Sequence, residues 1–183
     1  MLNLISIPHT GTHFLKRILE NAGFKLNIKH IEGWKPMDEL IVSPLRDPYE
    51  VYISWMTRGR DQDFTEKWHA FNDMYESQNV EVVPIDTENK RDHLKRLGDK
   101  LNTILTTDWK PVNSSGKKVK VDWVDLKEIY DLPVVKKFYK YPKPTEDDIK
   151  KVVRKLLAEQ RGSKEFAPNL FADCVEQLME QYQ

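Results

Sequence analysis

Two short segments of the chain carry residue types that bind anions. The first, residues 8–14 with the sequence PHTGTHF, lies between a short apolar run and a stretch of helical periodicity. Its glycine, two threonine hydroxyls and successive backbone N–H groups would lie at a helix N-terminus, where unpaired donors and the positive end of the helix dipole favour a phosphate. The second has Arg46 and, eight positions later, Ser54, whose guanidinium and hydroxyl can bind another anionic group. Two separate anion sites predict one ligand with phosphates at both ends.

Other chemistry fits the first segment less well. It contains only Gly11, and no lysine follows that glycine, so the pattern G-x-x-x-x-G-K-[ST] of ATP- and GTP-hydrolysing P-loop enzymes is not met. His9 and His13 have H-x-x-x-H spacing, but no glutamate lies between them, and no metal site is predicted. For this loop taken alone, a tight strand-to-helix connection that binds nothing is the alternative.

An alternation of strands and helices would position both segments. Asp47 and Pro48 are a natural N-cap and first residue of a helix, and Gly23 is a natural helix end. The predicted strands are 2–7, 26–30, 40–45 and 80–84, and the predicted helices are 11–22, 48 to about 58, 63–76 and 88–105. This order predicts an α/β domain with a P-loop-like, mainly parallel sheet flanked by helices. Ligands bind such sheets outside the carboxyl ends of the strands, where both segments would lie.

The chain after Thr106 has a different pattern. Residues 113–116, Asn-Ser-Ser-Gly, predict a turn between the two strands of a small hairpin, residues 109–112 and 117–121. Apolar spacing predicts helices over 122–130, 145–160 and 168–182, and Cys174 falls on the apolar face of the last one, where it would pack. We therefore expect a single domain over residues 1–183, with a nucleotide-binding core over 1–105 and the hairpin and C-terminal helices over 106–183.

The composition excludes several kinds of partner. The 183 residues include 29 basic and 29 acidic ones, so the formal net charge is zero and no global basic field attracts nucleic acid or an anionic membrane. One cysteine excludes a disulfide framework and a Cys-based zinc cluster, and it favours a reducing compartment. Neither a basic N-terminal region nor a run of ~18 apolar residues is found, so no signal peptide or membrane span is predicted. A cytoplasmic monomer or homodimer is expected.

The two anion-binding segments resemble those of the sulfotransferase superfamily. The family loop P-[KR]-[ST]-G-T-[TS]-W/x is similar to IPHTGTHFLKRIL here, and the family motif R-[DN]-x-x-x-x-x-x-S-[YW] is similar to RDPYEVYISW. The resemblance covers residues 1 to about 105. It implies transfer of a sulfuryl group from 3′-phosphoadenosine-5′-phosphosulfate (PAPS) to a hydroxyl or amine of a small-molecule or peptide acceptor. The product nucleotide would be 3′-phosphoadenosine-5′-phosphate (PAP).

The resemblance also implies roles for single residues of both segments. Phe14 occupies a position where many relatives have a tryptophan against the adenine, although its place on the apolar helix face makes core packing the alternative. His9 stands where the family usually has lysine or arginine, the cation that stabilises charge on the leaving phosphate, so its imidazole would be a weaker, pH-dependent version of that cation. The residues around the 5′-phosphosulfate would be His9, Thr10, Gly11, Thr12, His13 and Phe14, and those around the 3′-phosphate Arg46 and Ser54.

A catalytic base is expected near the end of the second predicted strand. The family base is commonly a histidine in a K-T-H segment upstream of the 3′-phosphate arginine, and His30 in IKHIEGW stands in the similar place. An imidazole is suited to accepting the proton of an acceptor hydroxyl. Glu32 is the alternative base, because some relatives use a carboxylate. Arg161 and Gly162 resemble a C-terminal segment that helps bind the 3′-phosphate.

Two other functions remain open from the sequence. One is a nucleotide or small-molecule kinase of the related P-loop architecture, which the absence of the Walker lysine disfavours. The other is a non-catalytic protein that binds PAP, which the replacement of the usual cation by His9 would explain. Titration with PAP, ATP and AMP would separate these classes.

Overall fold

The computed structural model describes residues 1–56, 63–106, 126–142, 145, 147–148 and 150–151. The chain divides into two compact units, Met1–Asp47 with Glu66–Lys110 and Pro48–Thr65 with Pro111–Gln183. The predicted hairpin, the helix over 168–182 with Cys174, and the pair Arg161 and Gly162 lie outside the described residues, as does most of the helix over 145–160.

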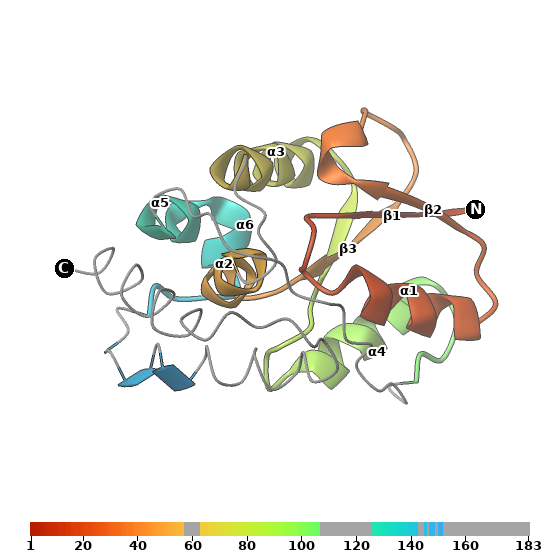
Figure 1. The fold of residues 1–183 in the computed structure, drawn as a ribbon. Helices are drawn as coiled ribbons and strands as arrows, with labels where there is room; N and C mark the ends of the chain where they lie inside the picture. Colours follow the sequence, from red (N-terminus) through yellow and green to blue (C-terminus); the bar gives the residue numbers. More distant parts are fainter. Residues whose placement is uncertain (57–62, 107–125, 143–144, 146, 149, 152–183) are drawn as a thin grey trace, which may run out of the picture. The chain divides into compact units, whose positions relative to one another are not determined.

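The first unit is built on a parallel sheet. Within the described residues it has four strands in the order β2-β1-β3-β4, and every neighbouring pair is parallel (Figure 1). The strands are β1 (Leu2–Ser6), β2 (Leu26–His30), β3 (Ile41–Leu45) and β4 (Val80–Pro84). Helices flank this sheet, so the predicted α/β class is confirmed. The predicted limits of β2 and β4 are also confirmed.

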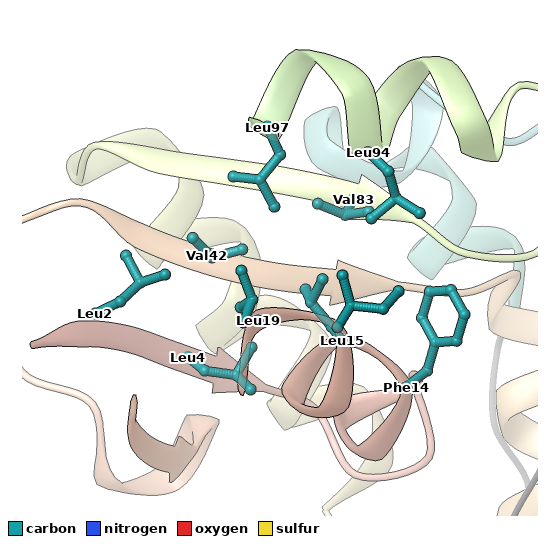
Figure 2. Close-up of a cluster of buried hydrophobic side chains, with 10 residues drawn as sticks. Leu2, Leu4, Phe14, Leu15, Leu19, Val42, Val83, Leu94 and Leu97 are labelled. Atoms are coloured by element: carbon teal, nitrogen blue, oxygen red, sulfur yellow. The ribbon is translucent and has the colours of Figure 1, made fainter. Parts of the chain in front are cut away.

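One face of the sheet is covered by α1 (Thr12–Asn21) and α4 (Lys90–Lys100). Leu2 and Leu4 are two positions apart in β1 and therefore point to the same face, where they meet the apolar stripe of α1. Figure 2 shows this cluster, which extends across the sheet to β4 and α4. Its buried members are Leu2, Leu4, Phe14, Leu15, Ile18, Leu19, Val42, Val83, Leu94 and Leu97. The apolar faces that the sequence predicts for the helices and strands thus pack together in one core.

The opposite face carries α3 (Phe64–Ser77) and the short 3-10 helix η1 (Ile31–Gly33), as Figure 1 shows. Within the part of α3 that belongs to the first unit, Trp68 and Phe71 are fully buried and their rings meet edge to face at 6.4 Å. The backbone N–H of Met37 donates to Gln78 Oε1 at 2.9 Å, which ties the loop before β3 to the segment after α3.

The second unit contains α2 (Pro48–Met56), α5 (Leu126–Asp131) and α6 (Pro133–Lys136) among its described residues. The prediction that α2 begins at Pro48 is confirmed. The ring of Phe64 meets those of Tyr52 and Trp55 edge to face, at 5.3 and 4.9 Å between centroids. The N–H of Tyr49 donates to Tyr130 Oη at 3.2 Å, so a tyrosine of α5 binds the first turn of α2.

Helices α1 and α4 end in the same way. Gly23 has φ 88° and donates to the carbonyl of Glu20, while Phe24 donates to Leu19, which together form a Schellman motif. At the end of α4, Asn102 has φ 52° and donates to Asp99, and the next N–H donates to the carbonyl of Gly98. The predicted continuation of this helix to Leu105 is therefore wrong, because the left-handed residue after Leu101 reverses the chain.

Replacement of Gly23 by alanine tests the first of these helix ends. We expect Gly23→Ala to lower the free energy of unfolding by about 1–2 kcal/mol, because an L side chain resists the left-handed conformation. Urea denaturation measures this loss. Gly33→Ala is the matched control, since a Cβ there meets nothing within 4 Å and its φ lies outside the left-handed region. Equal stability of the two variants would contradict the Schellman assignment.

Candidate functional site

The candidate site lies at the carboxyl edge of the parallel sheet in the first unit. Strands β1 and β3 are neighbours, but the chain proceeds from β1 to β2 on one side and from β3 to β4 on the other. A divergence of this kind opens a crevice outside the carboxyl ends of the two central strands, where α/β proteins bind ligands. The loop before α1 follows β1, and Arg46 follows β3 directly. Both predicted anion-binding segments therefore begin at this switch point.

The loop after β1 has an unusual backbone. His9 has φ 69° and Gly11 has φ 100°, so two residues of this short connection are left-handed. Between them, Thr10 is completely buried, and its Oγ1 donates to the carbonyl of Ile7 at 2.7 Å. The hydroxyl proton of Thr10 is therefore used in a hydrogen bond within the loop. The backbone N–H of this residue also donates to the carbonyl of Ile7, at 3.4 Å, so Thr10 fixes the shape of the loop.

The first turn of α1 provides the donors for an anion. Gly11 is the N-cap residue, no side chain caps the helix, and the first intrahelical bond runs from the N–H of Leu15 to the carbonyl of Gly11 at 3.1 Å. The N–H groups before Leu15 have no acceptor within the helix. The Oγ atoms of Thr12 and Ser6 are hydrogen-bonded at 2.6 Å, which places a hydroxyl pair beside these donors. His13 is exposed at the same turn.

The loop after β4 closes the site on the β3 side. A Cβ added to Gly11 would overlap Ile85 Cδ1, the end of a flexible side chain, so the two loops touch here and a larger residue would require Ile85 to move. The N–H of Ile85 donates to the carbonyl of Leu45 at 2.9 Å, and the carboxylate of Asp86 accepts the N–H of Asp47 at 2.8 Å. These bonds hold the chain on both sides of Arg46. The sequence pattern did not single out Ile85, because this residue acts through a contact between distant loops.

Phe14 is part of the hydrophobic core at the edge of the site. Its side chain is 6% exposed and belongs to the cluster between the sheet, α1 and α4, where Figure 2 shows it at one end. The ammonium of Lys90, the first residue of α4, lies 5.5 Å from the centroid of its ring. The packing alternative for Phe14 therefore has structural support, and its place against an adenine stays a prediction.

The two candidate bases differ in their surroundings. His30 ends β2 and is paired with Ser6 of β1, so both side chains lie on the face that α1 covers, on strands about 4.8 Å apart. Glu32 lies in η1, and its Oε1 is 2.8 Å from Lys67 Nζ. Partial burial alone would raise the pKa of the Glu32 carboxyl, but the hydrogen bond and charge of Lys67, its own backbone N–H and the nearby His30 lower it overall. A carboxylate of lowered pKa is a weaker base, which favours His30 for that role.

Ser54 belongs to the second unit. It lies in α2, and its side chain is 3% exposed. The first unit thus brings the loop 9–14, His30 and Arg46 to one edge of the sheet. The shared binding of a phosphate by Arg46 and Ser54 stays a prediction.

The ion pair of Glu32 predicts a pH-dependent contribution to stability. Because the pKa of folded Glu32 lies below its ordinary 4.5, the stabilisation is present above that pH and is lost as the pH falls through the folded value. We expect Lys67→Met to lower the free energy of unfolding at pH 7 by up to about 1 kcal/mol, since the carboxylate is half exposed, and by less at pH 3. Urea denaturation at both pH values measures this.

The matched control for that experiment is Lys95→Met. Lys95 Nζ lies 3.1 Å from Asp99 Oδ2, but both side chains are mostly exposed. Its removal is expected to change stability by no more than a few tenths of a kcal/mol. An equal effect of Lys67→Met at pH 7 and pH 3 would show that the pair with Glu32 does not cause the loss.

Comparison with known proteins adds no relative to this description. No family model, curated protein or solved structure matches the chain. In the part of the chain that the structure describes, no helix is long and apolar enough to cross a membrane. Among the same residues, no group of three or more His, Cys, Asp or Glu side chains is arranged to hold a metal ion. The chemistry of the chain is therefore inferred from the carboxyl edge itself.

Proposed function

We propose that this chain is a PAPS-dependent sulfotransferase. The observation that carries the proposal is the position of the two anion-binding segments, which follow the adjacent parallel strands β1 and β3 at the switch point of the sheet. A helix N-terminus with a glycine N-cap suits the 5′-phosphosulfate, and the guanidinium of Arg46 suits a second phosphate. PAPS has anionic groups at both of its ends. The motif resemblance of both segments to sulfotransferases supports the same ligand.

The proposed reaction is an in-line transfer of the sulfuryl group. The bond between sulfur and the 5′-phosphate oxygen breaks, its electron pair stays on that oxygen, and a new bond forms between sulfur and the acceptor oxygen or nitrogen. The acceptor proton passes to His30, and PAP leaves. Negative charge that develops on the 5′-phosphate is stabilised by the N–H groups of the first turn of α1 and by protonated His9.

The acceptor would be a hydroxyl or amine of a small molecule or peptide. We propose a cytoplasmic protein, monomeric or homodimeric, that binds neither nucleic acid nor a membrane, because the chain has one cysteine and no net charge. A kinase would instead turn over ATP with Mg²⁺, and a non-catalytic protein would bind PAP without transfer from PAPS. Calorimetric titration with PAP, ATP and AMP, followed by transfer assays, separates the three.

The 3′-phosphate provides the first test. We expect the wild type to bind PAP more tightly than AMP, and Arg46→Ala to remove most of that preference, since a charge-assisted contact contributes roughly 1.5–3 kcal/mol. That range corresponds to about 10- to 150-fold in Kd. Arg17→Ala, on the exposed side of α1, is the control and should keep the preference. Equal affinity of the wild type for PAP and AMP would end the sulfotransferase proposal.

The base provides the second test. We expect His30→Ala to reduce transfer from radiolabelled PAPS by about 10²–10⁴-fold while PAP affinity stays nearly unchanged, because His30 acts on the acceptor. A panel of hydroxyl and amine acceptors supplies the assay. His69→Ala in α3 is the histidine control and should keep full activity. Full activity of His30→Ala would assign the role to Glu32 or to no side chain.

A further inference from the structure

Lys90 is a cation beside the anion-binding loop that no sequence motif singles out. Its ammonium lies 5.5 Å from the centroid of the Phe14 ring, and Phe14 is the third residue of α1. Cations are attracted to the face of an aromatic ring, and this holds the lysine near the first turn of α1. The backbone donors proposed for the 5′-phosphate belong to that same turn.

Contacts of the loop before α4 fix the position of the Lys90 Cα. Lys90 begins α4, and its N–H donates to the carbonyl of Thr87 at 3.2 Å. The same loop places the Cδ1 end of Ile85 against Gly11, where an added Cβ would overlap it. The start of α4 and the start of α1 are therefore held together by packing, and the four methylenes of Lys90 can reach from the ring to a phosphate on α1.

Lys90 differs from three cations further along its helix. Lys95 pairs with Asp99 at 3.1 Å, whereas Arg96 and Lys100 each pair with Glu81 at 3.2 Å. Within the described residues, the side chain of Lys90 makes no ion pair, and its ammonium lies by the neutral ring of Phe14. Its charge is not cancelled by a carboxylate and is available to a bound anion.

A second group of the same loop lacks a partner. Thr87 Oγ1 is buried, and among the described residues it has no hydrogen-bond partner. A buried hydroxyl without a partner is costly, so a water or a ligand atom is expected to hydrogen-bond to it. A phosphate oxygen is a suitable acceptor for a hydroxyl proton.

We infer that Lys90, with the hydroxyl of Thr87, binds the 5′-phosphate end of the nucleotide and supplies the fixed positive charge that the loop lacks at His9. The inference rests on the proposed nucleotide site and adds a specificity-determining cation to it. Lysine carries its charge throughout the neutral pH range, which a histidine does not. The cation thus comes from the start of α4 rather than from the loop after β1.

Three adenosine ligands separate the contributions of the two phosphate sites. Calorimetry with AMP, PAP and adenosine 3′-phosphate is carried out at low ionic strength, where charge contacts are least screened. We expect Lys90→Met to weaken AMP and PAP by the same factor, at least about 10-fold, and to leave adenosine 3′-phosphate unchanged. Methionine keeps most of the side-chain volume, and an unchanged thermal unfolding midpoint shows that the core is intact.

Three further variants test the roles of charge and hydroxyl. Lys90→Arg keeps the charge and should bind AMP within about 3-fold of the wild type. Lys95→Met, on the same helix, should bind all three ligands as the wild type does. Thr87→Val should weaken AMP and PAP but leave the ligand-free protein at least as stable, because it removes a hydroxyl that has no partner there.

The outcomes distinguish this inference from the proposed function. If Lys90→Met binds AMP and PAP as the wild type does, Lys90 is a packing residue and the inference is wrong, while the proposed function stands. If the wild type binds PAP no better than AMP, but Lys90→Met weakens both, the proposed function fails and the Lys90 site stands. A wild type that binds none of the three ligands overturns both.

Discussion

The geometry of the candidate site depends on the contact between Gly11 and Ile85. At this point the loop after β1 and the loop after β4 approach so closely that a Cβ on Gly11 would overlap the Cδ1 end of Ile85 unless that side chain moved. The same residue has φ 100°, which L side chains resist. The requirement for glycine is therefore mainly conformational, and any larger residue would also displace the end of Ile85. Because the contact joins the first turn of α1 to the segment before α4, it determines which groups can surround an anion there.

Two charged side chains of this unit, Glu32 and Lys90, have different kinds of partner. On the η1 side, Glu32 is neutralised by Lys67 at 2.8 Å, so its negative charge is partly removed from the neighbourhood of His30. On the α4 side, Lys90 rests on a ring and keeps its charge. The chain has no net charge, so a local arrangement of this kind is what can attract an anion. The dipole of α1 adds to the same positive potential.

The sequence predicted the sheet well because strand and helix periodicities are local properties. The limits of β2 and β4 and the start of α2 at Pro48 follow from apolar runs and from proline. The end of α4 was missed, since Asn102 adopts a left-handed conformation that an apolar stripe through Leu105 does not reveal. The sequence analysis also did not predict the contact of Lys90 with Phe14 or the ion pair of Lys67 with Glu32. Each joins residues far apart in the chain, and such pairs depend on how the helices pack against the sheet.

An anion that binds a lysine must first displace the lysine's existing partner. That partner is a neutral ring in one case and a charged carboxylate in the other. An ion pair such as that of Lys95 and Asp99 would have to be broken, and the freed carboxylate would then repel the phosphate. Lys90 leaves only the face of Phe14, which is neutral and stays packed in the core with 6% of its surface exposed. Within the described residues, Lys90 in this way keeps a charge close to the first turn of α1 without an ion pair to a carboxylate.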